Sequence, residues 1–201
     1  SFYYLDYLQG MSLLYKLDFE KSKQYFNQFL KNVKGNNYIK STYHKLAWIA
    51  FLQGETDKTQ SYFKQVISEG SISVDEDKVA LKDAMKNYIT HSVLLRTRLL
   101  YDGGYYEKAL VEISIMQGAG WYKGYIDEYW YRLARIESKL DYNDKEVIAH
   151  YQLSIDFSEN TTNYYGPMSA LQIGLIYEQQ HNIKQAIIYF KKCLSLSNFD
   201  Y

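Results

Sequence analysis

The feature that most constrains the fold of this 201-residue chain is a pattern of three residues at fixed intervals, which recurs five times. A small residue is followed twelve positions later by a small or short residue, and four positions after that by a large apolar residue. The copies are Gly10, Ser22, Phe26; Ala47, Thr59, Phe63; Thr97, Ala109, Ile113; Gly174, Ala186, Phe190; and, with one residue inserted, Ala134, Val147, Tyr151. A small residue midway along one helix lets a second helix approach closely, and the large residue fills the remaining groove. The spacing therefore predicts five antiparallel helix pairs.

A turn separates the two small residues of each copy. In the third copy it is DGGYYEKAL at 102–110, where two glycines before a helix could also cradle a phosphate. This stretch lacks the lysine and the spacing of a phosphate-binding P-loop, and its four counterparts read as turns. We therefore interpret it as a turn. Gly54 and Gly104 are expected to adopt the left-handed conformation that ends many helices.

Apolar residues around these turns follow the three-four spacing of helices. The expected helix pairs lie near 2–33, 38–69, 89–117, 125–158 and 165–197. The interval between the second and third copies is the longest. It contains DEDKVALKDAMK, whose early acidic residues suit a helix amino terminus, so we expect an extra helix near 75–86.

These residues resemble the tetratricopeptide repeat (TPR) family, whose pattern runs W-x2-L-G-x2-Y and then A-x3-F. Ile173, Gly174, Tyr177, Ala186 and Phe190 match that pattern most closely. The resemblance implies an all-α fold, in which about five antiparallel helix pairs form a right-handed superhelical solenoid. It also implies that residues 1–201 form a single helical repeat domain.

Composition and motifs argue against several classes of function. The 23 basic and 23 acidic residues balance, whereas nucleic-acid binding is usually driven by a basic excess. The single cysteine excludes an intrachain disulfide and a thiolate zinc site, and the four histidines show no metal-binding spacing. No apolar run is long enough to span a membrane. We therefore expect no catalytic residues, no cofactor, no metal site and no nucleic-acid partner.

In the family that the chain resembles, the first helix of each pair lines a concave face that receives an extended peptide or a partner helix. Carrying this over places Tyr7, Met11, His44, Trp48, Arg98, Tyr131 and Arg135 in a partner-binding groove, with Leu171 and Leu175 from the fifth pair. Two arginines at the centre favour a partner that carries an acidic or carboxylate group. The resulting prediction is a non-enzymatic protein–protein interaction scaffold.

An alternative function follows from the 23 tyrosines, several of which occur in adjacent pairs. Aromatic rings can stack on sugars, so the chain could instead be a receptor-like domain that binds a glycan or another small ligand. The discriminating feature is a compact pocket with an aromatic platform, as opposed to an open groove.

The location of the protein is predicted from its first residues and from a second resemblance. The chain opens SFYYLDY without an initiator methionine, which indicates a fragment of a longer protein. LDFEKSKQYFNQFLKNVKGNNYIKSTYHKLAWIAFLQG and LLYDGGYYEKAL are similar to carboxy-terminal repeats of exported bacterial TPR proteins. An exported or periplasmic location is therefore favoured over a cytoplasmic one. The sequence indicates neither the oligomeric state nor the identity of the partner.

Overall fold

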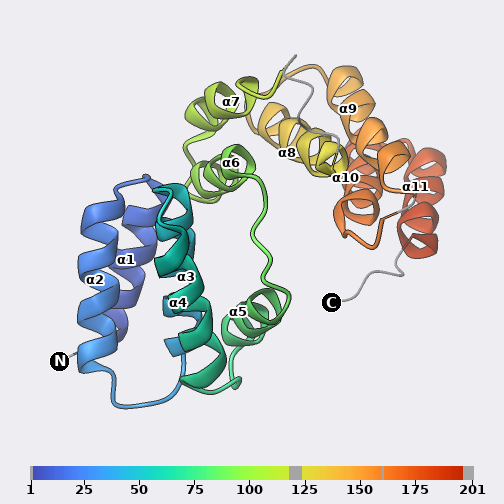
Figure 1. Cartoon of the computed structure of the whole chain (residues 1–201). Helices are drawn as coiled ribbons and strands as arrows, with labels where there is room; N and C mark the ends of the chain where they lie inside the picture. Colours follow the sequence, from blue (N-terminus) through green and yellow to red (C-terminus); the bar gives the residue numbers. More distant parts are fainter. Residues whose placement is uncertain (1, 118–123, 160, 197–201) are drawn as a thin grey trace. The chain divides into compact units, whose positions relative to one another are not determined.

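The structure is a computed structural model that describes residues 2–117, 124–159 and 161–196, and these residues form eleven α-helices (Figure 1). The helices are α1 Tyr4–Tyr15, α2 Phe19–Asn32, α3 Ile39–Leu52, α4 Thr56–Ser68, α5 Asp75–Met85, α6 Ser92–Asp102, α7 Tyr106–Ser114, α8 Ile126–Lys139, α9 Asp144–Phe157, α10 Tyr165–Gln179 and α11 Ile183–Ser195. The prediction of an all-α fold built from antiparallel helix pairs is confirmed, and α5 is the extra helix expected near 75–86.

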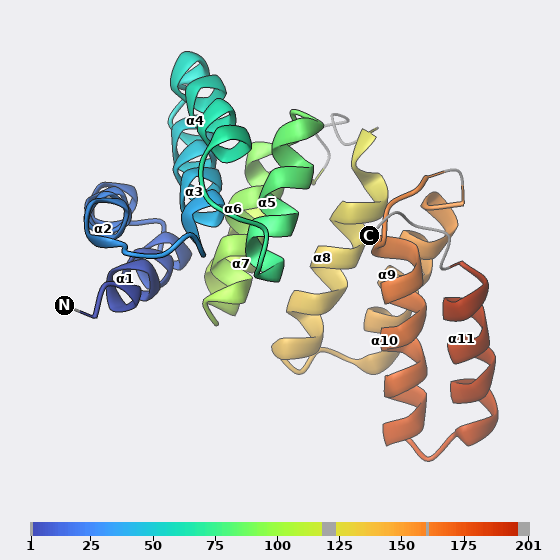
Figure 2. The ribbon, with the colours of Figure 1, turned by 90° about the horizontal axis from the view of Figure 1, so that it is seen from below.

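The chain divides into two compact units, Ser1–Leu95 and Arg96–Tyr201, with the boundary inside α6. In unit 1, α1 pairs with α2 and α3 pairs with α4, while α5 packs on α3 and α4. In unit 2, α8 pairs with α9 and α10 pairs with α11, while α7 packs on α8 (Figure 2). The second of these pairs continues the first, because α10 also packs on α9.

The recurring small and large residues meet at the centre of the helix pairs. The Phe26 ring lies so close to Gly10 that a Cβ atom built on this glycine would be 2.6 Å from Phe26 Cδ1. A Cβ atom built on Gly174 would likewise be 2.4 Å from Phe190 Cε1. The hydroxyl of Ser22, the second small residue of the first copy, donates to the Gly10 carbonyl at 2.8 Å. The spacing in the sequence is therefore the contact between two paired helices.

Every pair turns at a residue with positive φ, seven positions after the small residue of its first helix. These residues are Leu17, Gly54, Gly104, Asp141 and His181, with φ of 61°, 76°, 81°, 55° and 57°. The left-handed conformation predicted for Gly54 and Gly104 is confirmed, and DGGYYEKAL is the turn between α6 and α7. The helices that follow three of the turns are capped by Asp18, Asn143 and Asn182, whose side chains accept backbone N–H bonds.

Helix α5 is anchored to the amino terminus of α3 by one buried carboxylate. Asp77 Oδ2 accepts from the Tyr38 N–H at 2.6 Å, and Asp77 Oδ1 accepts from the Ser41 N–H at 2.8 Å. The first N–H groups of a helix have no partner within that helix, so α5 supplies what α3 lacks. Burial raises the pKa of Asp77, although the two backbone N–H groups act in the opposite direction.

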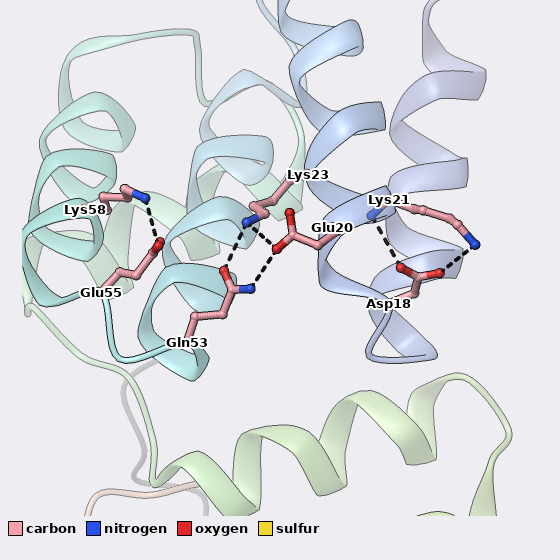
Figure 3. Close-up of polar contacts among 7 residues, drawn as sticks. All are labelled: Asp18, Glu20, Lys21, Lys23, Gln53, Glu55 and Lys58. Atoms are coloured by element: carbon pink, nitrogen blue, oxygen red, sulfur yellow. Dashed lines mark hydrogen bonds and ion pairs between the residues drawn. The ribbon is translucent and has the colours of Figure 1, made fainter.

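The two pairs of unit 1 are also connected by a polar network on their surface (Figure 3). Glu20 pairs with Lys23 at 2.7 Å, and both side chains contact the Gln53 amide at the end of α3. Exposed ion pairs of this kind contribute at most about 1 kcal/mol each. The register of α2 on α3 is therefore set mainly by the buried residues beneath.

The described residues were also searched for a membrane-spanning helix and for a cluster of metal-binding side chains. No helix within them combines the length and the apolar character needed to cross a membrane. They contain no group of three or more His, Cys, Asp or Glu side chains arranged to hold a metal ion.

Candidate functional site

The seven residues predicted to line a groove divide between the two units. Four belong to unit 1, where Tyr7, His44 and Trp48 are buried and Met11 is half-buried. The Tyr7 hydroxyl bonds the Ser41 hydroxyl at 2.9 Å, and Lys45 Nζ lies 3.6 Å from the centroid of the Trp48 ring. Burial leaves these three rings little surface for a partner. A groove that includes all seven residues stays a prediction.

The other three residues belong to unit 2, which brings Tyr131 and Arg135 of α8 together with Tyr101 of α6. The Arg135 guanidinium carbon lies 4.0 Å from the centroid of the Tyr101 ring and 5.4 Å from that of Tyr131. Arg98, on the same helix as Tyr101, lines the junction between α6 and α8 beside Arg135. The guanidinium of Arg135 is thus held between two aromatic rings, an arrangement that fixes its position and is attractive in itself.

The aromatic part of this site continues onto α10. Tyr131 is buried and lies 5.5 Å from the Tyr165 ring and 6.1 Å from the exposed Tyr164 ring, measured between centroids. Burial raises the pKa of Tyr131, so its hydroxyl stays neutral at physiological pH. We name the set Arg98, Tyr101, Tyr131, Arg135 and Tyr164 the arginine–tyrosine surface.

The charges at this surface are only partly balanced. Buried Arg132 is paired with buried Glu128, whose Oε1 accepts from Arg132 Nε at 2.7 Å. Arg98 Nε lies 3.5 Å from Asp102 Oδ2, and both side chains are partly exposed. Within the described parts of the chain, no carboxylate lies within 4.0 Å of Arg135. Burial opposes the charge of Arg135, but nearby Tyr131, Tyr101 and Asp102 outweigh it and raise its pKa.

The shape of the arginine–tyrosine surface suits contact with another chain more than enclosure of a small molecule. The gap between α6 and α8, lined by Arg98, Tyr101 and Arg135 among others, leaves no room for a water molecule. A fixed guanidinium flanked by aromatic rings can form two parallel hydrogen bonds to a carboxylate.

Sequence reasoning did not select two members of this surface. Tyr101 lies three residues after Arg98 on α6, and residues three apart share a helix face, so that spacing could have identified it. Tyr164 lies just before α10, and only the Tyr164–Tyr165 doublet marked it in the sequence. The centroid of the Tyr164 ring lies 4.4 Å from that of the Tyr165 ring, and Tyr165 is buried, with 6% of its surface exposed.

Unit 2 also contains a cleft of about 260 Å³ between α7, α8 and α9. Its lining includes Tyr129, Trp130, Tyr142, Glu137 and His150. The Trp130 ring stacks on His150 at 5.1 Å, and His150 Nδ1 lies 2.6 Å from Glu137 Oε2. Burial raises the pKa of Glu137, although the bond to His150 opposes this shift. The cleft combines an aromatic wall with a polar pair.

Comparison with known proteins identifies the repeats. Two family models described as tetratricopeptide repeat match the chain, one at residues 42–69 and the other at 169–200. These ranges fall on the pairs α3–α4 and α10–α11. No curated protein matches the sequence.

Solved structures with a similar fold share little sequence with this chain. MamA from Desulfovibrio magneticus RS-1, from residue 41 to its end, is 14% identical with a TM-score of 0.45, covering 96% of this chain and 94% of that one. The apo form of RapI is 15% identical with a TM-score of 0.48, covering 98% of this chain and 70% of that one.

Proposed function

We propose, from the tetratricopeptide repeats that this chain carries, that it is a non-enzymatic scaffold that binds a protein partner. The partner presents an acidic peptide or helix to the arginine–tyrosine surface on the first helices α6, α8 and α10 of unit 2. The carboxylate is received by Arg135 and Arg98, while Tyr101 and Tyr164 contact the adjoining apolar atoms and the buried Tyr131 supports Arg135 from below.

The observation that carries this proposal is the position of Arg135. Its guanidinium carbon lies over the rings of Tyr101 and Tyr131, at 4.0 and 5.4 Å, while the carboxylates of Asp102 and Glu128 are paired with Arg98 and Arg132. A side chain that is already ordered loses less conformational entropy when a ligand binds, a saving of about 0.5–1.5 kcal/mol. Arginine and tyrosine are also the residue types that most often dominate the energy of protein interfaces.

The test is an array of extended peptides that carry glutamate or aspartate, each paired with a counterpart in which glutamine or asparagine replaces the acid. The labelled chain should bind members of the acidic set and bind their amide counterparts about tenfold more weakly, since loss of one charge-assisted contact costs about 1.4 kcal/mol or more. Arg135→Gln should reduce binding of the acidic peptides by a similar factor.

The matched control is Lys139→Gln, which removes the same charge from an exposed position one turn along α8. Its affinity for the acidic peptides should equal that of the wild type. Equal binding of acidic and amide peptides, or equal losses in the two variants, would contradict recognition at Arg135.

A second candidate is a receptor for a glycan or another small ligand, and the cleft between α7, α8 and α9 favours it. Its volume, about 260 Å³, suits a single sugar ring, and Tyr129, Trp130 and Tyr142 provide aromatic surface. A panel of mono- and oligosaccharides tests this candidate by thermal stabilisation. Tryptophan fluorescence is a second readout, and comparison with Trp130→Phe isolates the contribution of Trp130 among the three tryptophans. Stabilisation by a sugar that Trp130→Phe abolishes would favour it, whereas no shift across the panel would exclude sugars as the ligand.

A further inference from the structure

Helix α5 is the extra helix of unit 1, and its two sides differ in character (Figure 1). On the inner side, the small residues Ala80 and Ala84 are buried in a core cluster with residues of α3 and α4. The outer side carries Met85, a large apolar residue that is 72% exposed. The chain continues into α4 on one side of α5 and into α6 on the other, so this exposure does not arise at an end of the sequence.

The outer side of α5 is hollowed, with an apolar floor. A hollow of about 530 Å³ lies there, and Ile72, Leu81 and Met85 form its apolar lining. Ile72 precedes the helix and is 52% exposed. A hollow of this size has room for apolar side chains of a partner. Methionine adapts its shape to the groups that pack against it, which is why surfaces that bind helices often use it.

The other residues that line this hollow are all lysines, namely Lys78, Lys82 and Lys86. They are spaced at intervals of four residues, so they form one row along the helix, about 12 Å long. Lys78 Nζ lies 2.8 Å from a carboxylate oxygen of Asp75, but both side chains are more than half exposed, and such pairs contribute little. A carboxylate from a partner can therefore replace Asp75 at low cost. We name the three apolar residues and the three lysines together the α5 hollow.

The acidic residues of α5 lie outside the α5 hollow. Asp77 is buried and bonded to backbone N–H groups of α3, and Asp83 Oδ2 lies 3.5 Å from Nε2 of His44, also on α3. The helix and its carboxy-terminal cap together carry four acidic residues and three lysines. A membrane surface responds to charge averaged over about 8 Å or more, a distance at which these acids offset the lysines. A partner that enters the hollow meets the lysines directly.

We infer that the α5 hollow binds an acidic amphipathic helix of a partner protein. Apolar side chains of that helix pack on Ile72, Leu81 and Met85, and its carboxylates, one turn apart, pair with the row of lysines. Burial of apolar surface supplies the affinity, and the lysines select an acidic helix over a neutral or basic one. The inference goes beyond the proposed function, because it concerns unit 1 and shares no residue with the arginine–tyrosine surface.

A designed helical peptide tests this inference. It is labelled with fluorescein and carries leucines on one face, with glutamates one turn apart beside them. Two counterparts replace every glutamate by glutamine or by lysine, residues of similar helix propensity. Fluorescence anisotropy with the 201-residue chain should show that the glutamine peptide binds about tenfold more weakly than the glutamate peptide. The lysine peptide should bind more weakly still.

Charge reversal on the protein provides the decisive comparison. The double variant Lys78→Glu, Lys86→Glu should lose at least about tenfold in affinity for the glutamate peptide and should bind the lysine peptide more tightly than the wild type does. Both positions are exposed, so the variant should keep the helical circular dichroism of the wild type. The matched control is Lys31→Glu, Lys64→Glu, which makes the same change of charge at exposed positions of α2 and α4. It should bind the glutamate peptide like the wild type.

Three results would overturn the inference. The first is no binding of the glutamate peptide at about 300 µM, or equal losses in the two double variants. The second is loss of this binding in Arg135→Gln, which would assign the peptide to the arginine–tyrosine surface. The third is binding of the wild type to phosphatidylserine vesicles, abolished by Lys78→Glu, Lys86→Glu, without any binding of the peptide. That result would identify the α5 hollow as a membrane contact.

Discussion

Leu17 and Gly54 occupy equivalent positions in the turns of two successive helix pairs, and both have a left-handed backbone, with φ of 61° and 76°. Each lies seven residues after the small residue of its first helix and five before that of its second. The left-handed conformation costs a residue with a Cβ atom roughly 1–2 kcal/mol, and glycine essentially none. The turn geometry is therefore imposed by the packing of the pair, and three of the five turns adopt it without glycine.

This relationship predicts that His181→Gly stabilises the protein. His181 has φ of 57° and an exposed side chain, so glycine removes the strain and loses little burial. We expect a net gain of about 0.5–1 kcal/mol in the free energy of unfolding, because the larger backbone entropy of glycine in the unfolded chain offsets part of the relieved strain. Urea denaturation measures it. Gly104→Ala, at the same step of the third pair, should lose a similar amount, and a loss in both variants would contradict the account.

A second prediction concerns the contact between Gly10 and Phe26. Helix propensity alone would make Gly10→Ala stabilising by about 1 kcal/mol. The new methyl group would lie 2.6 Å from the fully buried Phe26 ring, however, so the ring or the helices must shift, at a cost of about 1–3 kcal/mol. We expect net destabilisation in urea, and none for Gly10→Ala in a Phe26→Leu background.

Gly35→Ala is the control for that contact, since a Cβ atom there meets no atom within 4 Å. Its effect should stay within about 0.5 kcal/mol. Stabilisation by Gly10→Ala in the wild-type background would show that the pair is loosely packed at its centre.

The sequence predicts a contact correctly where the packing of two helices admits only one type of residue. Gly10 and Gly174 were predicted as close contacts because only a small side chain lets paired helices approach, and their Phe partners lie there. The same reasoning did not reveal the left-handed Leu17, since leucine carries no preference for that backbone. The packing of the two flanking helices offsets the strain of such a turn. A local sequence pattern does not contain this packing energy, so it does not reveal the left-handed residue.

Site prediction was limited by side-chain burial. Positions on the first helix of a pair were assigned to one face by their register, yet Tyr7 and Trp48 are buried where Arg98 and Arg135 keep exposed surface. The difference arises because long charged side chains extend to solvent from positions where aromatic rings fold into the core. Register identifies which helix face a residue occupies, and the neighbouring side chains decide how much of it a partner can reach.

A third prediction follows from the attachment of α5 to α3. Asp77→Ala leaves the Tyr38 and Ser41 N–H groups without their carboxylate, and each buried unpaired group costs about 1–3 kcal/mol. Urea denaturation should therefore show a large loss of stability. Hydrogen exchange should locate it, with faster exchange at the start of α3 and throughout α5.

Asp75→Ala is the matched control for Asp77, because it removes a carboxylate from the same turn of α5. Asp75 is exposed and pairs only with Lys78, one turn along its own helix. Its exchange pattern should match that of the wild type. Protection of the Tyr38 and Ser41 amides that persists in Asp77→Ala would show that another group caps α3.

A fourth prediction concerns the pH dependence of unit 2. Burial raises the pKa of Glu137 above its ordinary value of 4.5, more than the hydrogen bond from His150 lowers it. The folded protein therefore binds this proton more tightly than the unfolded chain. The resulting contribution to stability is complete below the unfolded pKa and is lost as pH rises through the folded pKa. Glu137→Gln removes this titration and keeps a side chain of the same shape.

The free energy of unfolding of the wild type minus that of Glu137→Gln should thus fall as the pH rises above 4.5, the ordinary pKa of this carboxyl. Urea denaturation of both proteins at several pH values measures it, and taking the difference cancels every group that is not coupled to Glu137. His150 and Glu146 are the coupled groups, so the series is repeated in His150→Gln. There the fall should be steeper, because the bond that opposes the shift is gone. A difference that instead rises with pH would show that the ion pair with His150 outweighs the burial of Glu137.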